Sequence, residues 1–174
     1  MSAQKADNPM RKIRVQKVVL NIGVGKSGEI VEKAQEVLRQ ITGREPIQTK
    51  ARKSVRDWGV HKGEPIGVKV TVMRDGAVQL LKRLLIVRAL KLPTSSFDDE
   101  GNVSFGIKEH LEIPGIKYDP ETGIFGLDVN VKLERPGYRV ARRRLCPSKV
   151  GKKQKVTRDE MIKFMTDTFN VEVA

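Results

Sequence analysis

One segment constrains the fold of this chain more than any other: residues 124–133 alternate between apolar side chains and polar or small ones. The apolar positions are Phe125, Leu127, Val129, Val131 and Leu133, and between them stand Gly126, Asp128, Asn130 and Lys132. A period of two indicates a β-strand, because successive side chains of a strand point to opposite faces of the sheet. The segment therefore predicts a sheet with one face in the core and the other face uncovered.

Two earlier segments repeat this two-faced pattern. Residues 13–24 predict a strand with Val18, Leu20 and Ile22 on the core face and Lys17, Val19 and Asn21 on the opposite face. Residues 66–73 predict another, with Val68, Val70 and Val72 on the core face and Lys69 and Thr71 opposite. If these two strands are neighbours, four hydrogen-bonding side chains share one platform: Lys17, Asn21, Lys69 and Thr71.

Helical periodicity separates the strands. From Glu29 to Thr42 an apolar stripe recurs at helical spacing, and Gly43 supplies a stop. The stripe consists of Ile30, Ala34, Val37, Leu38 and Ile41. Asp75 is the expected N-cap of a second helix that runs to about Leu92, before Pro93, and buries Val78, Leu81 and Leu85.

The order of elements indicates the fold class. Further strands are expected at residues 46–50 and 103–107, and a capping box at 157–160 predicts a short last helix. Together they predict an α+β fold: a largely antiparallel sheet with helices packed on one face and the other face open. We expect an α+β domain over residues 1–134, with a projecting basic arm at 51–65. A basic extension with a short C-terminal helix, 135–174, is expected to pack on the same domain.

Charge is concentrated in separate stretches of this chain of net charge +13. Residues 44–74 hold eight Lys and Arg against three acids, residues 135–158 hold ten against none, and residues 95–134 hold three against nine. This balance favours polyanionic partners, either nucleic acid or an anionic membrane. No apolar run approaches the ~20 residues that span a bilayer, and residues 1–10 contain no apolar signal-peptide segment, so we expect an intracellular protein.

The segment Gly23–Gly28 invites a nucleotide-binding interpretation, because it fits G-x-G-x-x-G between a predicted strand and a predicted helix. The phosphate-binding loop of NTPases needs a glycine five positions before Gly25, where the sequence has Leu20. A dinucleotide site needs an acid about 20 positions later, and residues 47–50 offer none. We favour a glycine-rich turn, and a nucleotide-binding enzyme that uses Gly23–Gly28 is the alternative.

Other reactive side chains are sparse. A single cysteine, Cys146, excludes an internal disulfide, and with His61 and His110 it does not make a zinc cluster. The adjacent acids Asp98–Glu100 give no evidence of a paired acid and base. We therefore expect no enzyme, no cofactor and no metal.

Five motifs together resemble a known family. They are Lys17–Gly25, Lys50–Ser54, Pro65–Thr71, Phe105–His110 and Gly115–Pro120. Their order and spacing over residues 9–140 resemble large-subunit ribosomal protein five. The segment Gly123–Val129 and the basic extension are similar to the archaeal and eukaryotic branch of that family.

The resemblance implies a structural constituent of the large ribosomal subunit, in the cytoplasm, that binds 5S rRNA at the central protuberance through its sheet face. The 5S rRNA contacts are expected at Lys17, Asn21, Arg44, Gln48, Lys69 and Thr71. Arg44 departs from the family pattern, since many relatives carry Gln there. The arm is expected to touch P-site tRNA or large-subunit rRNA through Lys50, Arg52, Lys53, Arg56 and Lys62. Additional rRNA contacts are expected at Arg142, Arg143, Arg144, Lys149, Lys152 and Lys153.

Two further expectations concern partners. The acidic stretch from Asp98 to Glu121 is expected to face a basic small-subunit protein at an intersubunit bridge. Neither a membrane nor a second copy of the chain is expected as a partner. A third interpretation is a general binder of nucleic acid or anionic membrane with no fixed partner, whose binding would ignore RNA identity and vanish with salt.

Overall fold

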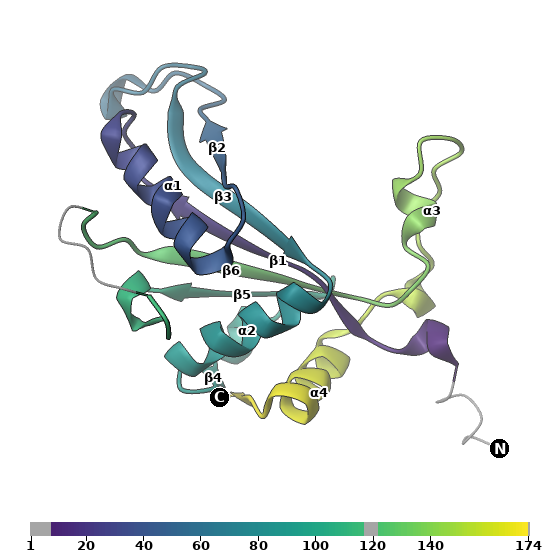
Figure 1. Cartoon of the computed structure of the whole chain (residues 1–174). Helices are drawn as coiled ribbons and strands as arrows, with labels where there is room; N and C mark the ends of the chain where they lie inside the picture. The colour runs from purple at the N-terminus through teal and green to yellow at the C-terminus, as the bar shows by residue number, and fades with distance from the viewer. Residues whose placement is uncertain (1–7, 117–121, 174) are drawn as a thin grey trace.

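The computed structural model describes residues 8–116 and 122–173, which form an α+β fold (Figure 1). The elements are β1 (Arg14–Gly23), α1 (Glu29–Thr42), β2 (Ile47–Lys50), β3 (Pro65–Met73), α2 (Asp75–Val87), β4 (Lys91–Leu92), β5 (Asn102–Ile107), β6 (Leu127–Glu134), α3 (Arg139–Arg142), α4 (Arg158–Phe169) and β7 (Glu172–Val173). Short 3-10 turns lie at Pro9–Arg11, Arg56–Trp58, Thr94–Ser96, His110–Glu112 and Lys152–Gln154.

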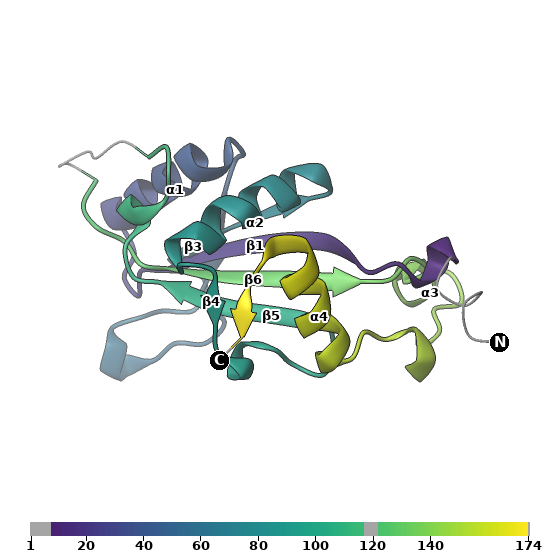
Figure 2. The ribbon, with the colours of Figure 1, turned by 90° about the horizontal axis from the view of Figure 1, so that it is seen from below.

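The main sheet has five strands in the order β2-β3-β1-β6-β5, and each neighbouring pair is antiparallel. A small parallel pair, β4 and β7, joins the end of α2 to the end of the chain. Figure 2 shows α1 and α2 on one side of the main sheet. The predicted α+β class, with its largely antiparallel sheet, is confirmed.

The core lies between the sheet and these helices. The inward side chains of β1 are the predicted Val18, Leu20 and Ile22, and each is at most 1% exposed. Helix α1 packs mainly over β3 with one apolar stripe: Val31, Ala34, Val37, Leu38 and Ile41. Helix α2 adds Ala77, Leu80, Leu81, Leu84 and Leu85, and α4 adds Met161, Met165 and Phe169.

Two helical predictions need correction. Ile30 is 45% exposed, and its neighbour Val31 is buried in its place. Both residues fit a helical stripe that includes Ala34, so periodicity alone did not separate them at the first turn. The second helix ends at Val87 instead of Leu92, because Ala89 and Leu90 adopt left-handed conformations at φ 50° and φ 59°.

The start of that helix and its stripe also differ from the prediction. The N-cap is Arg74, and Asp75 is the first helical residue. Val78 is only partly buried against the core. Beyond the left-handed turn, Leu92 lies in β4 and is buried.

The strand predicted at 124–133 begins later, at Leu127. Residues 124–126 leave the ladder because Phe125 bonds to a 3-10 turn instead: its amide donates to His110 Nδ1 at 3.2 Å, and its carbonyl accepts from the His110 amide at 3.0 Å. The alternation continued past the ladder because Phe125 is itself packed against the core.

The two ends of the basic extension pack against the main body and the N-terminal turn, whereas α3 and the loop after it project away from the sheet (Figure 1). Arg135, whose side chain is 12% exposed, donates to the carbonyls of Arg11 and Lys155 at 3.1 and 3.0 Å and forms an ion pair with Glu160 at 2.6 Å. Gln154 donates to the carbonyls of Met10 and Pro136 at 2.9 and 2.8 Å. These bonds connect three distant stretches of sequence at one end of the sheet.

Candidate nucleic-acid interface

The face of the sheet turned away from α1 and α2 carries the predicted polar platform. β1 and β3 are neighbours, and their register places Asn21 opposite Lys69 and Val19 opposite Thr71. Directly opposed side chains of an antiparallel pair have Cβ atoms about 4.5–5.5 Å apart. Lys17 lies on the same face, four positions before Asn21. The predicted placement of these four side chains on one face of the sheet is therefore confirmed.

The neighbouring strands extend this platform with residues that the sequence analysis did not assign to it. In β6, Asn130 stands opposite Val19, and Asp128 stands opposite Asn21. In β5, Ser104 stands opposite Asn130. The polar alternation of residues 126–132 was the available signal, but the sequence did not reveal that β6 lies directly beside β1.

The chemistry of this surface suits the backbone of a folded RNA. Amide and hydroxyl side chains offer directional bonds to phosphate and ribose oxygens, and lysines supply positive charge. None of the strand positions on this face is aromatic. The platform therefore fits recognition by shape and backbone better than stacking on splayed bases.

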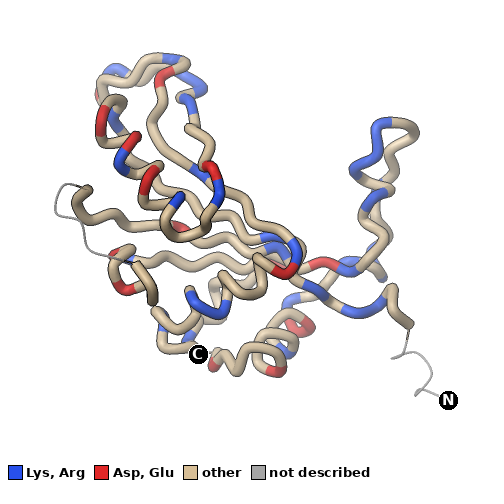
Figure 3. The backbone as a smooth tube through the Cα atoms, viewed as in Figure 1, with Lys and Arg blue, Asp and Glu red and all other residues tan. Residues whose placement is uncertain are grey.

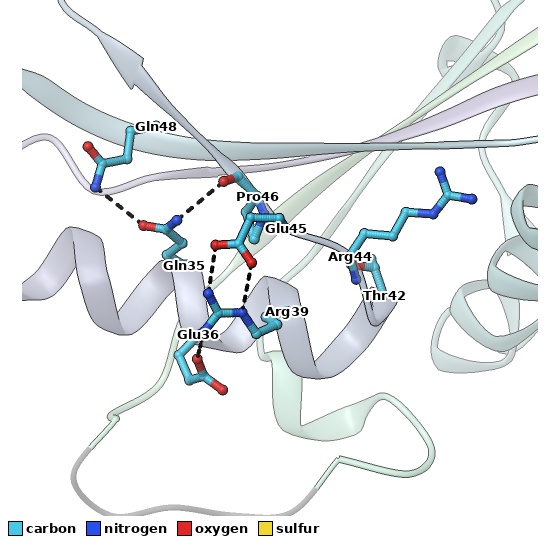
Figure 4. A network of polar contacts seen from close by, with 8 residues as sticks. All are labelled: Gln35, Glu36, Arg39, Thr42, Arg44, Glu45, Pro46 and Gln48. Carbon is cyan, nitrogen blue, oxygen red and sulfur yellow. Dashed lines mark hydrogen bonds and ion pairs between the residues drawn. The ribbon is translucent and has the colours of Figure 1, made fainter.

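Two of the six predicted 5S rRNA contacts lie elsewhere. Gln48 stands opposite Val68, on the helix side of the sheet, and its Nε2 donates to Gln35 Oε1 of α1 at 3.3 Å (Figure 4). Arg44 follows α1, and its side chain lines a shallow pocket with Thr42, Gly76 and Arg83. An RNA that contacts all six residues must wrap round the edge formed by β2.

An ion-pair network fixes the loop that carries Arg44. Arg39 donates to both carboxylate oxygens of Glu45, at 3.1 and 2.6 Å, and also pairs with Glu36 at 2.7 Å (Figure 4). The hydrogen bond from Arg39 lowers the pKa of Glu45. All three side chains are substantially exposed, so the network sets the shape of the loop more than it stabilises the protein.

The predicted arm is a hairpin that projects from β2 and β3. In Figure 2 it lies on the side of the sheet away from α1 and α2, and Figure 3 shows Lys and Arg spread along it. The five predicted arm contacts are all exposed: Lys50, Arg52, Lys53, Arg56 and Lys62. The arm therefore presents its charge on the same side as the polar platform.

The extension uses part of its charge internally. Arg142 bonds to the buried carboxylate of Glu134, and Arg143 Nε donates to the Cys146 carbonyl at 2.8 Å. The other four predicted cations there are exposed, and none forms a side-chain bond within the described part of the chain: Arg144, Lys149, Lys152 and Lys153.

The predicted acidic surface is also partly occupied. Asp98 accepts bonds from the amides of Glu100 and Asn102, at 2.9 and 2.7 Å, so it holds its own turn together. Partial burial raises the pKa of Asp98, but these bonds outweigh that effect and lower it. Glu100 pairs with Lys155 at 3.1 Å. Asp119 and Glu121 lie outside the described residues. Asp99, Glu109 and Glu112 are exposed and form no salt bridge within the described part of the chain.

The Gly23–Gly28 segment forms a turn whose first amides are already used. The amides of Val24 and Gly25 donate to the Ile66 carbonyl at 3.0 and 2.9 Å, so they are not free to cradle a phosphate. Gly25 and Gly28 have φ of 77° and 113°, which explains the glycines sterically. Ser27 lies just before the N-cap, which is Gly28.

Other candidate chemistry is limited. His110 is buried, and its burial lowers the pKa of the imidazole. Within residues 8–116 and 122–173, no group of three or more His, Cys, Asp or Glu is placed to hold a metal ion. No helix in this part of the chain is long and apolar enough to cross a bilayer.

Comparison with known proteins decides the family. A model described as ribosomal protein L5 matches residues 8–61, and a second model, described as the C-terminus of the same ribosomal family, matches residues 65–164. This chain belongs to the ribosomal protein L5 family. The motif-based prediction of the family is confirmed.

Similar proteins carry the name large ribosomal subunit protein uL5. The one from Pyrobaculum aerophilum is 54% identical over 166 residues, covering 95% of this chain and 93% of that protein. The one from Sulfolobus acidocaldarius is 49% identical, covering 99% and 97%, and the one from Nitrosopumilus maritimus is 48% identical, covering 99% of both. The predicted archaeal branch is confirmed. These names describe ribosomal proteins, in agreement with the prediction that the chain is not an enzyme.

Proposed function

We propose that this protein is a structural constituent of the large ribosomal subunit that binds 5S rRNA and helps attach it at the central protuberance. The observation that carries this proposal is the open sheet face, where Lys17, Asn21, Lys69 and Thr71 share one surface opposite the helices. The relatives' name supports the subunit. A folded polyanion is the partner that this combination of directional polar groups and positive charge fits.

The remaining surfaces take secondary roles in the proposal. The arm contacts P-site tRNA or large-subunit rRNA, and the free cations of the extension pack against rRNA. The acidic stretch from Asp98 to Glu121, in which Asp99 is exposed, faces a basic small-subunit protein at an intersubunit bridge. In this arrangement the protein acts in the cytoplasm, as part of the ribosome.

The test of the sheet face is a binding comparison. The purified protein is titrated with 5S rRNA and with an unrelated folded RNA of similar length, across a range of salt concentrations. Asn21→Ala and Thr71→Ala each remove a directional polar group and should lower 5S affinity by about 5- to 30-fold, which corresponds to about 1–2 kcal/mol. Gln40→Ala is the matched control, because Gln40 is exposed on the helix side.

The outcomes separate a specific site from general polyanion binding. A preference for 5S rRNA that persists at high salt and falls in both variants supports the sheet face as a specific site. Equal binding to both RNAs, unchanged by either variant, would refute it and leave a general polyanion binder. Arg44→Ala and Gln48→Ala add a further test: a loss in these variants shows that the RNA reaches round the β2 edge.

A further inference from the structure

The tip of the arm carries an aromatic side chain that the protein leaves uncovered. Trp58 closes the 3-10 turn Arg56–Trp58 and is 76% exposed. It is the single tryptophan of the chain. A tryptophan buries about 150–250 Å² when it finds a partner, so an exposed one at the end of a projection is a strong candidate contact.

The arm holds this side chain in a defined place. Val55 and Val60 form an antiparallel bridge with bonds of 2.9 and 3.2 Å, and the Gly59 amide donates to the Arg56 carbonyl at 3.0 Å. Nearer the base, the Lys62 amide donates to Ser54 Oγ at 2.9 Å. The tip is therefore a braced turn with little ordering left to do on binding, which favours affinity.

The backbone directly after the tryptophan is also uncovered. Gly59 has φ 64°, and apart from its two chain neighbours no heavy atom of the described residues lies within 4 Å of the position that a Cβ would take there. This left-handed position ends the 3-10 turn directly after the tryptophan.

The charges around the tip select the kind of partner. Arg52, Arg56 and Lys62 are exposed on the arm. The two acids of the arm are Asp57 and Glu64. Glu64 is used internally, since its carboxylate accepts from the His61 amide at 2.8 Å, whereas Asp57 is exposed. An uncovered aromatic among cations fits a nucleic acid, where the ring stacks on a base and the cations meet the flanking phosphates.

We propose that Trp58 stacks on an unpaired base of a folded RNA while Arg52, Arg56 and Lys62 hold the phosphates on either side. The inference rests on the proposed role of the arm in RNA binding and adds the chemistry of the contact. The polar sheet face has no aromatic strand position, so the two surfaces read RNA differently: the sheet by backbone and shape, the arm tip by stacking.

The single tryptophan makes the contact directly measurable. Emission from the full-length protein is followed during titration with tRNA and, separately, with 5S rRNA. Stacking quenches this emission, and the RNA that quenches identifies the source of the base. Binding of the same RNAs is then compared for Trp58→Phe and Trp58→Leu, with Ile86→Ala as the control because Ile86 is an exposed apolar residue on α2.

The proposal expects quenching by one of the RNAs, an affinity loss of about 5- to 100-fold in Trp58→Leu, and substantial retention in Trp58→Phe. Unchanged emission, or equal affinity of the Leu and Phe variants for the quenching RNA, overturns stacking. The double variant Arg52→Gln, Arg56→Gln distinguishes failure of the stacking proposal from failure of the proposed RNA-binding role of the arm. If this variant loses affinity while Trp58→Leu does not, the arm binds RNA without stacking; if neither loses affinity, the arm has no role in binding the RNA.

Discussion

Arg135→Lys tests whether a single guanidinium holds the basic extension against the rest of the fold. The native side chain donates to three backbone carbonyls, of Arg11, Lys153 and Lys155, and to the Glu160 carboxylate. Lysine keeps the charge but has one compact ammonium group instead of a planar fork. It therefore cannot reach these partners together.

The cost follows from the geometry. The bonds to Arg11 and Lys155 contribute about 1 kcal/mol each, and the Glu160 pair about 1 kcal/mol after screening, because Glu160 is 39% exposed. The Lys153 contact, at 3.4 Å, adds little. If lysine recovers one of these bonds, the substitution costs about 2 kcal/mol, or about 4–8 °C in Tm for a chain of this size.

Thermal unfolding followed by circular dichroism measures this change, with Arg139→Lys as the control. Arg139 is exposed and makes no side-chain bond within the described residues.

The contribution of Glu160 depends on pH. Partial burial raises the pKa of Glu160, but bonds from Thr157 and Arg135 outweigh this effect and lower the pKa below its ordinary value of 4.5. Its stabilisation is therefore present above pH 4.5 and lost as the pH falls through the lower folded-state value. A Tm for Arg135→Lys equal to that of the control at pH 7 would refute the reasoning.

Three further predictions concern stability. Gly101→Ala should lower the free energy of unfolding, measured in urea, by about 2–4 kcal/mol, because Gly101 has φ 90° and a Cβ would lie 2.6 Å from the Leu133 carbonyl oxygen. The control Gly151→Ala, where a Cβ has open space, should cost far less. Equal costs for the two variants would contradict the argument. The lowered pKa of buried His110 means that the unfolded state protonates first below pH 6.5, so Tm should fall from pH 7 to pH 5. His110→Gln should make Tm fall less between pH 7 and pH 5. An unchanged dependence of Tm on pH would show that other groups cause the fall. Thr157→Ala removes the capping box of α4 and should lower the free energy of unfolding in urea by about 1 kcal/mol. An unchanged urea midpoint would show that the cap contributes nothing.

The sequence predicted the strand faces well because parity is a local property. The assignment of Lys17 and Asn21 to one face, and Lys69 and Thr71 to another, required only the period of two. That the two faces are one surface depended on β1 and β3 being neighbours, which the structure shows. The contributions of β5 and β6 were missed because strand order is set by tertiary packing.

The differences between prediction and structure have local physical causes. α2 ends at two non-glycine residues in left-handed conformations, Ala89 and Leu90, and no glycine marks that turn. Gln48 was predicted as an RNA contact from a family resemblance, which stays a prediction; its register with Val68 turns it toward α1, away from the platform. A resemblance carries residue identity, but the direction of a side chain at a sheet edge depends on the register of that edge.

Charge counts gave the right class of partner and overestimated the charge that is available to it. Of the ten cations in residues 135–158, half are engaged within the protein. They are Arg135, Arg142, Arg143, Lys155 and Arg158. A sequence cannot distinguish these from the free ones, because all of them except Arg143 have partners on other elements, such as Glu134 on β6, Glu160 on α4 and Glu100 before β5. The extension is thus both a fold-stabilising clamp and a smaller cationic surface, and only the second part depends on a polyanion.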